Sequence, residues 1–203
     1  MRLHPSFLLA LLAATPPAAA QTRAVSDGWH LGGGVSALRF GHVAVSDAAP
    51  GVAAEVRPSG RAGLHLAVAR TAGAWSVWVE AGYAGGCVEA ANDAVAIQDR
   101  SADVSRHRLA AALERRLASV GTGTVGAGLL PTLDLWTVNG EGRLRGGLEA
   151  RVILRVPLGA VELEHSAALG LSGSPIESAD VGEVAELRGL RTWGVGVGLR
   201  VRI

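Results

Sequence analysis

The C-terminal segment from Leu187 to Ile203 alternates between two kinds of residue at almost every position. The odd-numbered positions carry large apolar side chains such as Trp193, Val195 and Val197, and the even-numbered positions carry mainly glycine and arginine. Successive side chains of a β-strand point to opposite faces of the sheet. The segment therefore predicts one long strand with an apolar face on one side and a glycine and arginine face on the other.

The same period of two recurs along most of the chain. It is clear in three further segments and weaker in four: Trp75–Tyr83, Leu144–Leu158, Val161–Leu171, Trp29–Phe40, Arg61–Arg70, Val104–Ala118 and Thr122–Trp136. These make about eight strands, many close to the length that a tilted strand needs to cross a bilayer. Hydrophobic residues are 49% of the chain, yet beyond its first residues no apolar run reaches the roughly 18 residues of a membrane-spanning helix. The pattern favours strands over helices throughout.

The connections between these strands alternate in length. Three are long and polar (Gly41–Gly60, Gly85–Ala102 and Ser172–Val184), three are tight (Thr71–Gly73, Ser119–Gly121 and Pro157–Gly159), and Thr137–Arg143 is intermediate. Membrane barrels have short turns on the periplasmic side and longer loops outside. We therefore predict an all-β fold: a closed antiparallel transmembrane up-and-down β-barrel of about eight strands.

The first residues form a targeting segment. Arg2 and His4 give a short polar start, Phe7–Ala14 is apolar, and Ala18–Ala20 offers small residues before position 21. This is the pattern of a secretory signal peptide, and its apolar run is too short to span a bilayer. We expect residues 1–20 to be the signal peptide and residues 21–203 to be the exported barrel.

Several function classes are excluded by composition and spacing. The formal net charge is +1 and the basic residues are dispersed, so no nucleic-acid partner is expected. His165 and Ser166 are adjacent, so on a strand they face opposite sides and cannot form a nucleophile–base pair. The histidines lack the spacing of a metal site, and the single cysteine, Cys87, is expected at the start of a loop. We predict no enzyme activity, catalytic residue, metal or cofactor.

On these features residues 21–203 resemble the small outer-membrane β-barrel proteins of the OmpA-type transmembrane and opacity-protein kind. The most specific motif is the C-terminus, where Gly198, Val201 and Ile203 look like the C-terminal strand signal that the barrel-insertion machinery recognises. The resemblance implies an outer-membrane location, lipid and lipopolysaccharide as surroundings, and a monomer. It departs from the family in having Ile203 in place of a terminal aromatic residue.

Two further features follow from that resemblance. Trp29, Trp75, Tyr83 and Trp193 are the candidates for the aromatic girdles at the two membrane interfaces. Pro131 cannot donate a hydrogen bond to a neighbouring strand, and a closed barrel has no edge strand to hold it, so we expect it at a bulge.

The face opposite the apolar one carries charges of both signs. Its predicted ion-pair network comprises Glu80, Arg106, Arg108, Glu114, Arg116, Glu149, Arg151, Arg155, Glu162, Glu164, Arg200 and Arg202. We expect Glu114, Arg116, Arg151, Arg155, Glu162, Glu164, Arg200 and Arg202 in the periplasmic half, and Glu80, Arg106, Arg108 and Glu149 nearer the middle. An eight-stranded barrel is just wide enough for side chains to fill it, and buried charges must be paired. This predicts a barrel plugged by arginine–glutamate pairs.

Three functions are compatible with this pattern. The first is a structural or surface-interaction protein that presents loops on the plugged barrel. The second is a minor channel for small solutes. The third is a periplasmic lipocalin-like carrier, in which the apolar face would lie inside around a ligand. The loop that holds Glu177 and Asp180 contains no basic residue, so its carboxylates are expected to be solvated or to bind lipopolysaccharide through divalent cations.

Overall fold

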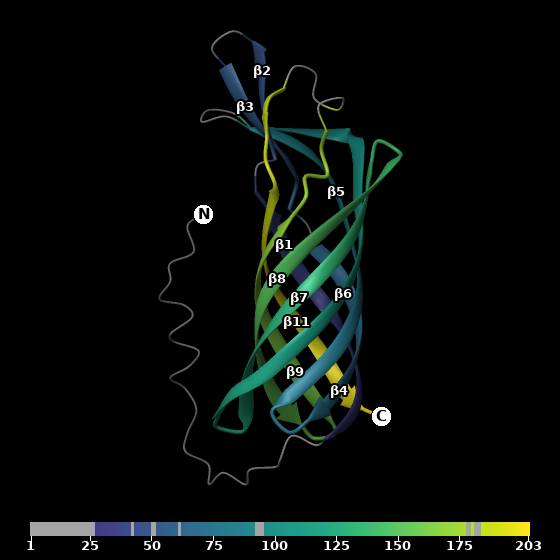
Figure 1. Cartoon of the computed structure of the whole chain (residues 1–203), viewed down its shortest axis with the longest axis vertical. Helices are drawn as coiled ribbons and strands as arrows, with labels where there is room; N and C mark the ends of the chain where they lie inside the picture. Colours follow the sequence, from purple (N-terminus) through teal and green to yellow (C-terminus); the bar gives the residue numbers. More distant parts are fainter. Residues whose placement is uncertain are drawn as a thin grey trace.

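The computed structural model describes residues 27–41, 43–49, 52–60, 62–91, 96–177, 180 and 184–203. The predicted signal peptide, residues 1–20, lies outside them. Eight long strands wind round a common axis (Figure 1). They are β1 (Gly28–Phe40), β4 (Ala62–Ala72), β5 (Trp75–Ala91), β6 (Ala96–Val120), β7 (Gly123–Val138), β8 (Glu141–Leu158), β9 (Val161–Ser172) and β11 (Leu190–Arg202). Within the described part of the chain, no helix is long and apolar enough to cross a membrane.

These strands close into a ring. The neighbours follow the order β5-β4-β1-β11-β9-β8-β7-β6, and β6 pairs again with β5. Each strand of the ring is antiparallel to both of its neighbours. The first and last strands, β1 and β11, form the closing seam, which runs from His30 opposite Arg202 to Phe40 opposite Thr192. The predicted closed up-and-down barrel is confirmed.

The two faces of each strand are as the sequence predicted. On β5, Val77 is 58% exposed and Val79 51% exposed on the outer surface, whereas Trp78 and Glu80 between them are buried. The other strands repeat this arrangement, with apolar side chains outside and most of the arginine and glutamate side chains inside. An apolar outer surface suits lipid. It contradicts the lipocalin-like alternative, which needed that face inside.

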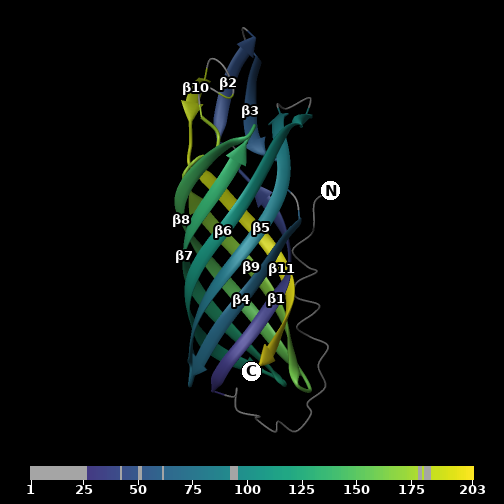
Figure 2. The ribbon, with the colours of Figure 1, turned by 90° about the vertical axis from the view of Figure 1, so that its right-hand side faces the viewer.

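Three short strands continue the sheet of the ring beyond one end of the barrel. Strands β2 (Ala44–Ala49), β3 (Val52–Pro58) and β10 (Val184–Leu187) lie in the order β10-β2-β3-β5. They project from the end opposite the chain's C-terminus (Figure 2). The predicted loop Gly41–Gly60 is therefore largely a β-hairpin. The last strand of the ring begins at Leu190 rather than at Leu187, which belongs to β10.

The prediction of a long polar loop at Gly85–Ala102 is wrong. Most of it continues β5 to Ala91 and resumes as β6 at Ala96, and the two extensions pair with each other. The polar residues of this segment indicated a loop. Backbone pairing, however, needs no apolar face once the strands leave the bilayer, so a polar segment can still form strands. Cys87 consequently lies within a strand and is buried, and its backbone N–H donates to Ser59 Oγ at 3.0 Å.

The connection between β7 and β8 is also shorter than expected. Asn139 and Gly140 have φ of 51° and 84°, so both occupy the left-handed region. Two such residues in succession form the tight turn that suits the twist of a hairpin, for which Asn-Gly is favoured. The strands therefore extend to within two residues of each other, at Val138 and Glu141.

Pro131 does not lie at a bulge. The β6–β7 register is the same on both sides of it, with Ala110 opposite Thr132 and Leu113 opposite Leu129. The pairs between them, which would include Pro131, are absent from the ladder, while on the other side Pro131 stays opposite Leu148 of β8. The missing N–H is thus accommodated by a local gap in one ladder without a shift of register.

Candidate functional site

The interior of the barrel is the candidate site, and its charged side chains lie in layers. In the layer nearest the short turns, Arg155 Nη2 donates to Glu114 Oε2 at 2.7 Å and Arg155 Nε to Glu164 Oε2 at 2.9 Å. Glu114 is 2% exposed. Arg200, which is buried, donates to Thr71 Oγ1 at 2.6 Å, and its Nε is 3.8 Å from Glu162. This lower layer joins β4, β6, β8, β9 and β11 across the lumen.

A second charged layer lies about halfway along the barrel. Arg151 Nη1 donates to Glu80 Oε2 and Arg151 Nη2 to Glu149 Oε1, each at 2.7 Å. Arg108 Nη1 approaches the other oxygen of Glu149, also at 2.7 Å. The guanidinium of Arg151 lies 4.9 Å from the ring centre of Trp78. This middle layer therefore spans β5, β6 and β8, with its charges alternating in sign.

Apolar side chains fill the space around the charged layers. A buried cluster of Ala69, Trp78, Ala110, Ala112, Leu130 and Ile153 lies in the same interior. On the opposite wall the inward positions of β1 and β11 are mostly glycine or small. Two cavities next to that wall have volumes of about 30 and 50 Å³, and both are bordered by His65 and Glu80. Cavities of this size hold at most a few water molecules.

Towards the far end the lumen becomes predominantly apolar. Arg106 Nη2 donates to Asp134 at 2.7 Å, and its guanidinium lies 6.0 Å from the ring centre of Phe40 and 5.3 Å from that of Trp136. Above this pair is a buried cluster of Phe40, Val43, Val56, Val104, Trp136, Val138, Ile176 and Leu190. Three of its members, Val43, Val56 and Ile176, come from the connections above the barrel. The outer mouth is thus closed by an apolar cap.

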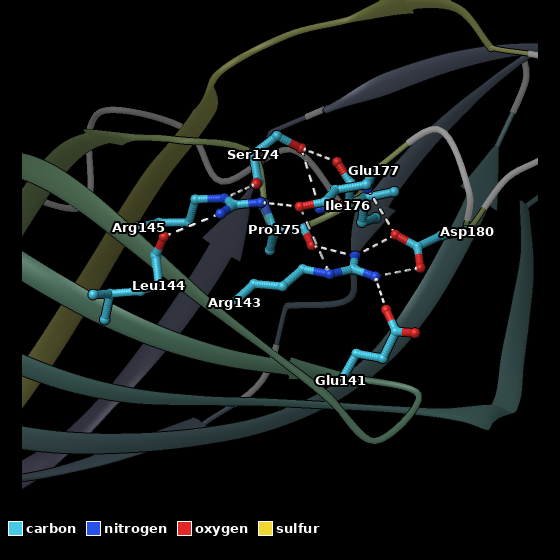
Figure 3. Close-up of polar contacts among 9 residues, drawn as sticks. All are labelled: Glu141, Arg143, Leu144, Arg145, Ser174, Pro175, Ile176, Glu177 and Asp180. Carbon is cyan, nitrogen blue, oxygen red and sulfur yellow. Dashed lines mark hydrogen bonds and ion pairs between the residues drawn. The ribbon is translucent and has the colours of Figure 1, made fainter.

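Two arginines of β8 hold part of that cap in place (Figure 3). Arg143 donates to both oxygens of Asp180, to Glu141 Oε2 at 2.8 Å and to the carbonyl oxygen of Pro175 at 2.8 Å. Arg145 donates to the carbonyl oxygen of Ser174 and to Glu177. We call these contacts the mouth clamp.

The clamp corrects the expectation that the carboxylates of this connection lack basic partners. The basic partners come from the facing edge of β8 and not from the connection itself. The hydrogen bond from Arg143 lowers the pKa of Asp180, and the hydrogen bond to Asp180 in turn raises the pKa of Arg143. Ile176, between the clamped residues, is 1% exposed. The ion pairs therefore hold an apolar side chain inside the mouth.

The predicted interior residues are not all brought together. Arg151 lies with the middle layer rather than in the periplasmic half, and Arg106 lies above that layer with Asp134. Within the described residues, Arg116 and Arg202 form no ion pair, and Arg202 is exposed. Arg143, and the aromatic rings that pack on Arg106 and Arg151, were not predicted from the sequence. The one indication of those rings in the sequence is that Trp78 and Trp136 occupy inward-facing positions of their strands.

The outward aromatic side chains lie in two groups. Trp29 and Trp75 are exposed near the short turns, and Tyr83 and Trp193 are exposed near the opposite rim. Between the two groups the outer surface is dominated by leucine, valine and alanine. The arrangement matches the girdles of membrane barrels.

Comparison of folds places the chain among small outer-membrane barrels. The crystal structure of Neisserial surface protein A superposes with a TM-score of 0.57 at 12% identity, covering 87% of this chain and 97% of that one. The crystal structure of the outer membrane protein OprG from Pseudomonas aeruginosa gives 0.60 at 11% identity, with 88% and 96% covered. The solid-state NMR structure of outer membrane protein AlkL in DMPC bilayers gives 0.54 at 14%, with 93% and 96% covered.

At the level of sequence, no family model matches the chain and no curated protein matches it. The identities to the solved structures are low, so these neighbours establish the fold. Two of the three are named as outer membrane proteins and the third as a surface protein, in agreement with the predicted location. The resemblance to small outer-membrane barrels is confirmed.

Proposed function

We propose that this outer-membrane β-barrel serves as a closed, membrane-anchored platform that presents the β2–β3 and β10 extension outside the cell. The observation that carries the proposal is the succession of closures along one lumen. Two charged layers, with apolar side chains packed around them, are followed by the clamped apolar cap, and the two cavities beside the layers accommodate only a few water molecules. A barrel filled in this way supports a structural or surface-interaction role better than transport.

The remaining features of the proposal concern partners. Lipid and lipopolysaccharide surround the apolar face, and Gly198, Val201 and Ile203 form the signal for the barrel-insertion machinery. Ile203 and the outward Val201 are exposed at the end of β11, where another protein would reach them during assembly. The barrel works as a monomer and carries no catalysis. Residues 1–20 are removed as a signal peptide on export.

A minor small-solute channel is the second candidate, favoured by the two cavities along the glycine-rich wall. Conductance in planar bilayers separates the two functions. We expect the purified protein to show no large, steady conductance, because paired charges and apolar side chains fill the lumen.

The control for the conductance experiment is the double variant Glu80→Ala/Arg151→Ala, which removes two of the four charged residues of the middle layer and should raise the leak. Large, steady, cation-selective channels in the wild-type protein would contradict the plug and promote the channel.

A further inference from the structure

Four arginines are exposed on the outer surface of the barrel, in two groups near its two rims. Arg39 and Arg191 are exposed near the rim that carries the extension, and Arg70 and Arg115 are exposed near the short turns. None of these four arginines forms an ion pair within the described residues. An arginine facing lipid is costly near the midplane and tolerated near the interfaces, where it reaches phosphate groups.

Three of these arginines lie against a tryptophan. The guanidinium carbon of Arg39 is 6.0 Å from the ring centre of Trp193, that of Arg70 is 5.7 Å from Trp29, and that of Arg115 is 5.5 Å from Trp75. Tryptophan prefers the headgroup level of a bilayer. The rings thus mark the level at which each guanidinium meets lipid headgroups.

Of the four described arginines, the two at the rim that carries the extension converge on one spot. Arg39 is directly opposite Trp193 across the β1–β11 seam, and Arg191 follows two residues beyond Trp193 on the same face. The backbone continues this seam, because Gly41 N–H donates to the carbonyl oxygen of Arg191 at 2.7 Å. Diagonal neighbours of this kind lie about 7–8 Å apart at the backbone, within reach of two long side chains directed at one group.

The surface beside this pair is suited to a hydrocarbon chain. Leu171 is directly opposite Arg191, and Leu169 is directly opposite Trp193. These leucines are 64% and 69% exposed, and the neighbouring Val195 is 62% exposed. A basic pair at headgroup level therefore lies directly above a smooth apolar surface on β9 and β11.

We propose that Arg39, Arg191 and Trp193 form a binding site for one phosphorylated lipid of the outer leaflet, with the phosphate held by the two guanidinium groups and an acyl chain lying over Leu169, Leu171 and Val195. The inference rests on the proposed orientation, in which the extension faces outside, and not on the closed lumen. Guanidinium groups bind phosphate bidentately and are weakly hydrated, which suits an interfacial site. Lipopolysaccharide, whose lipid A carries phosphates, is the occupant that this site fits.

The test is native mass spectrometry of the refolded barrel in detergent micelles, titrated with diphosphorylated lipid A. We expect wild-type protein to retain one lipid A, and Arg39→Gln/Arg191→Gln to bind it at least tenfold more weakly. Wild-type protein should bind fully dephosphorylated lipid A as weakly as the double variant binds the phosphorylated form. Arg39→Lys/Arg191→Lys, which keeps the charge but loses the bidentate geometry, should fall between.

The matched control is Arg70→Gln/Arg115→Gln at the other rim. These arginines lie on β4 and β6, on either side of β5, and their guanidinium groups pack on two different rings, Trp29 and Trp75, so they are not directed at one phosphate. This variant should retain lipid A as wild type does. Equal retention of phosphorylated and dephosphorylated lipid A by wild-type protein would overturn the site, even if the glutamine variants failed to fold. A closed lumen would be unaffected by that result.

Discussion

Individual charged residues in this barrel are stabilised by partners on other strands. Arg151, with a side chain 8% exposed, contacts both Glu80 and Glu149. Removal of one member of a buried ion pair leaves the others without compensation, which costs more than the pair itself contributes.

Replacing Arg151 by methionine should therefore destabilise the folded barrel by about 3–5 kcal/mol. The measurement is urea unfolding of the refolded protein in lipid vesicles. Arg116→Met is the matched control, because Arg116 faces the same lumen, forms no ion pair with any described residue, and should cost much less. Equal losses in the two variants would show that side-chain packing, and not charge pairing, accounts for the effect.

The mouth clamp gives a residue-scale prediction for pH. The pKa of Asp180 is lower in the folded loop than in the unfolded chain, because Arg143 donates to its carboxylate. The stabilisation from Asp180 is therefore complete above the ordinary aspartate pKa of about 4 and is lost as the pH falls through the lower, folded pKa. Pepsin cleavage of the connection after β9 should accelerate over that acidic range.

Asp180→Asn should loosen the same connection already at neutral pH, as measured with a neutral protease, and should remove the part of the acid response that belongs to this residue. If the variant and the wild type respond to acid identically, the clamp does not hold the cap.

At the scale of the strand, the alternation of faces decides which substitutions the membrane tolerates. Val197 lies in the middle of β11 and is 40% exposed on the outer face. Val197→Arg should hinder insertion and cost about 2–4 kcal/mol if the position lies at the bilayer midplane. Leu158→Arg, at the last residue of β8 beside a short turn, should cost about 1 kcal/mol or less. Folding yield into vesicles and urea unfolding measure both, and a similar cost at the two depths would argue against the assigned lipid face.

The closing seam between β1 and β11 depends on glycine for a different reason. A Cβ at Gly34 would lie 2.4 Å from the carbonyl oxygen of Val197 and 2.7 Å from Gly198 Cα, so the obstacle is backbone. Gly34→Ala should therefore destabilise the barrel by about 1–3 kcal/mol, the usual cost of overpacking.

Gly170→Ala on β9 is the control for the seam, because the nearest atom to its Cβ would be 3.6 Å away. Thermal unfolding followed by the gel shift of the folded barrel would compare the two. Gly196 is unsuitable as a control, since its Cβ would lie 2.8 Å from Ser166 Oγ and 3.2 Å from the carbonyl oxygen of Val35. If Gly34→Ala is as stable as Gly170→Ala, the seam has more freedom than the register implies.

For the whole molecule, the main prediction is its orientation. The extension lies at the end opposite the short turns, and membrane barrels direct their short turns to the periplasm. An epitope inserted between Asn139 and Gly140 should be labelled by antibody on intact cells. The same epitope in the turn at Gly121 should be labelled only after the outer membrane is permeabilised. The reverse pattern would invert the topology and, with it, the leaflet assigned to the lipid site.

The sequence by itself determined the barrel and its two faces. The lipid-facing residues can be identified from the sequence. Alternate residues of a strand lie on opposite faces, and in a bilayer one of those faces must be continuously apolar. The Asn139-Gly140 turn and the inward parity of Glu80, Arg151 and Trp78 were readable for the same local reason.

Only the tertiary structure decided which of those residues meet. Ion-pair partners depend on the stagger of eight strands round a closed ring, and the period of two carries no information about stagger. Arg151 therefore joins the middle layer, and Arg143 reaches a carboxylate in a connection far along the chain. The strand extensions beyond the bilayer could also not be predicted from the sequence. Outside lipid the backbone can pair without an apolar face, so these segments lack the apolar alternation that indicates a strand.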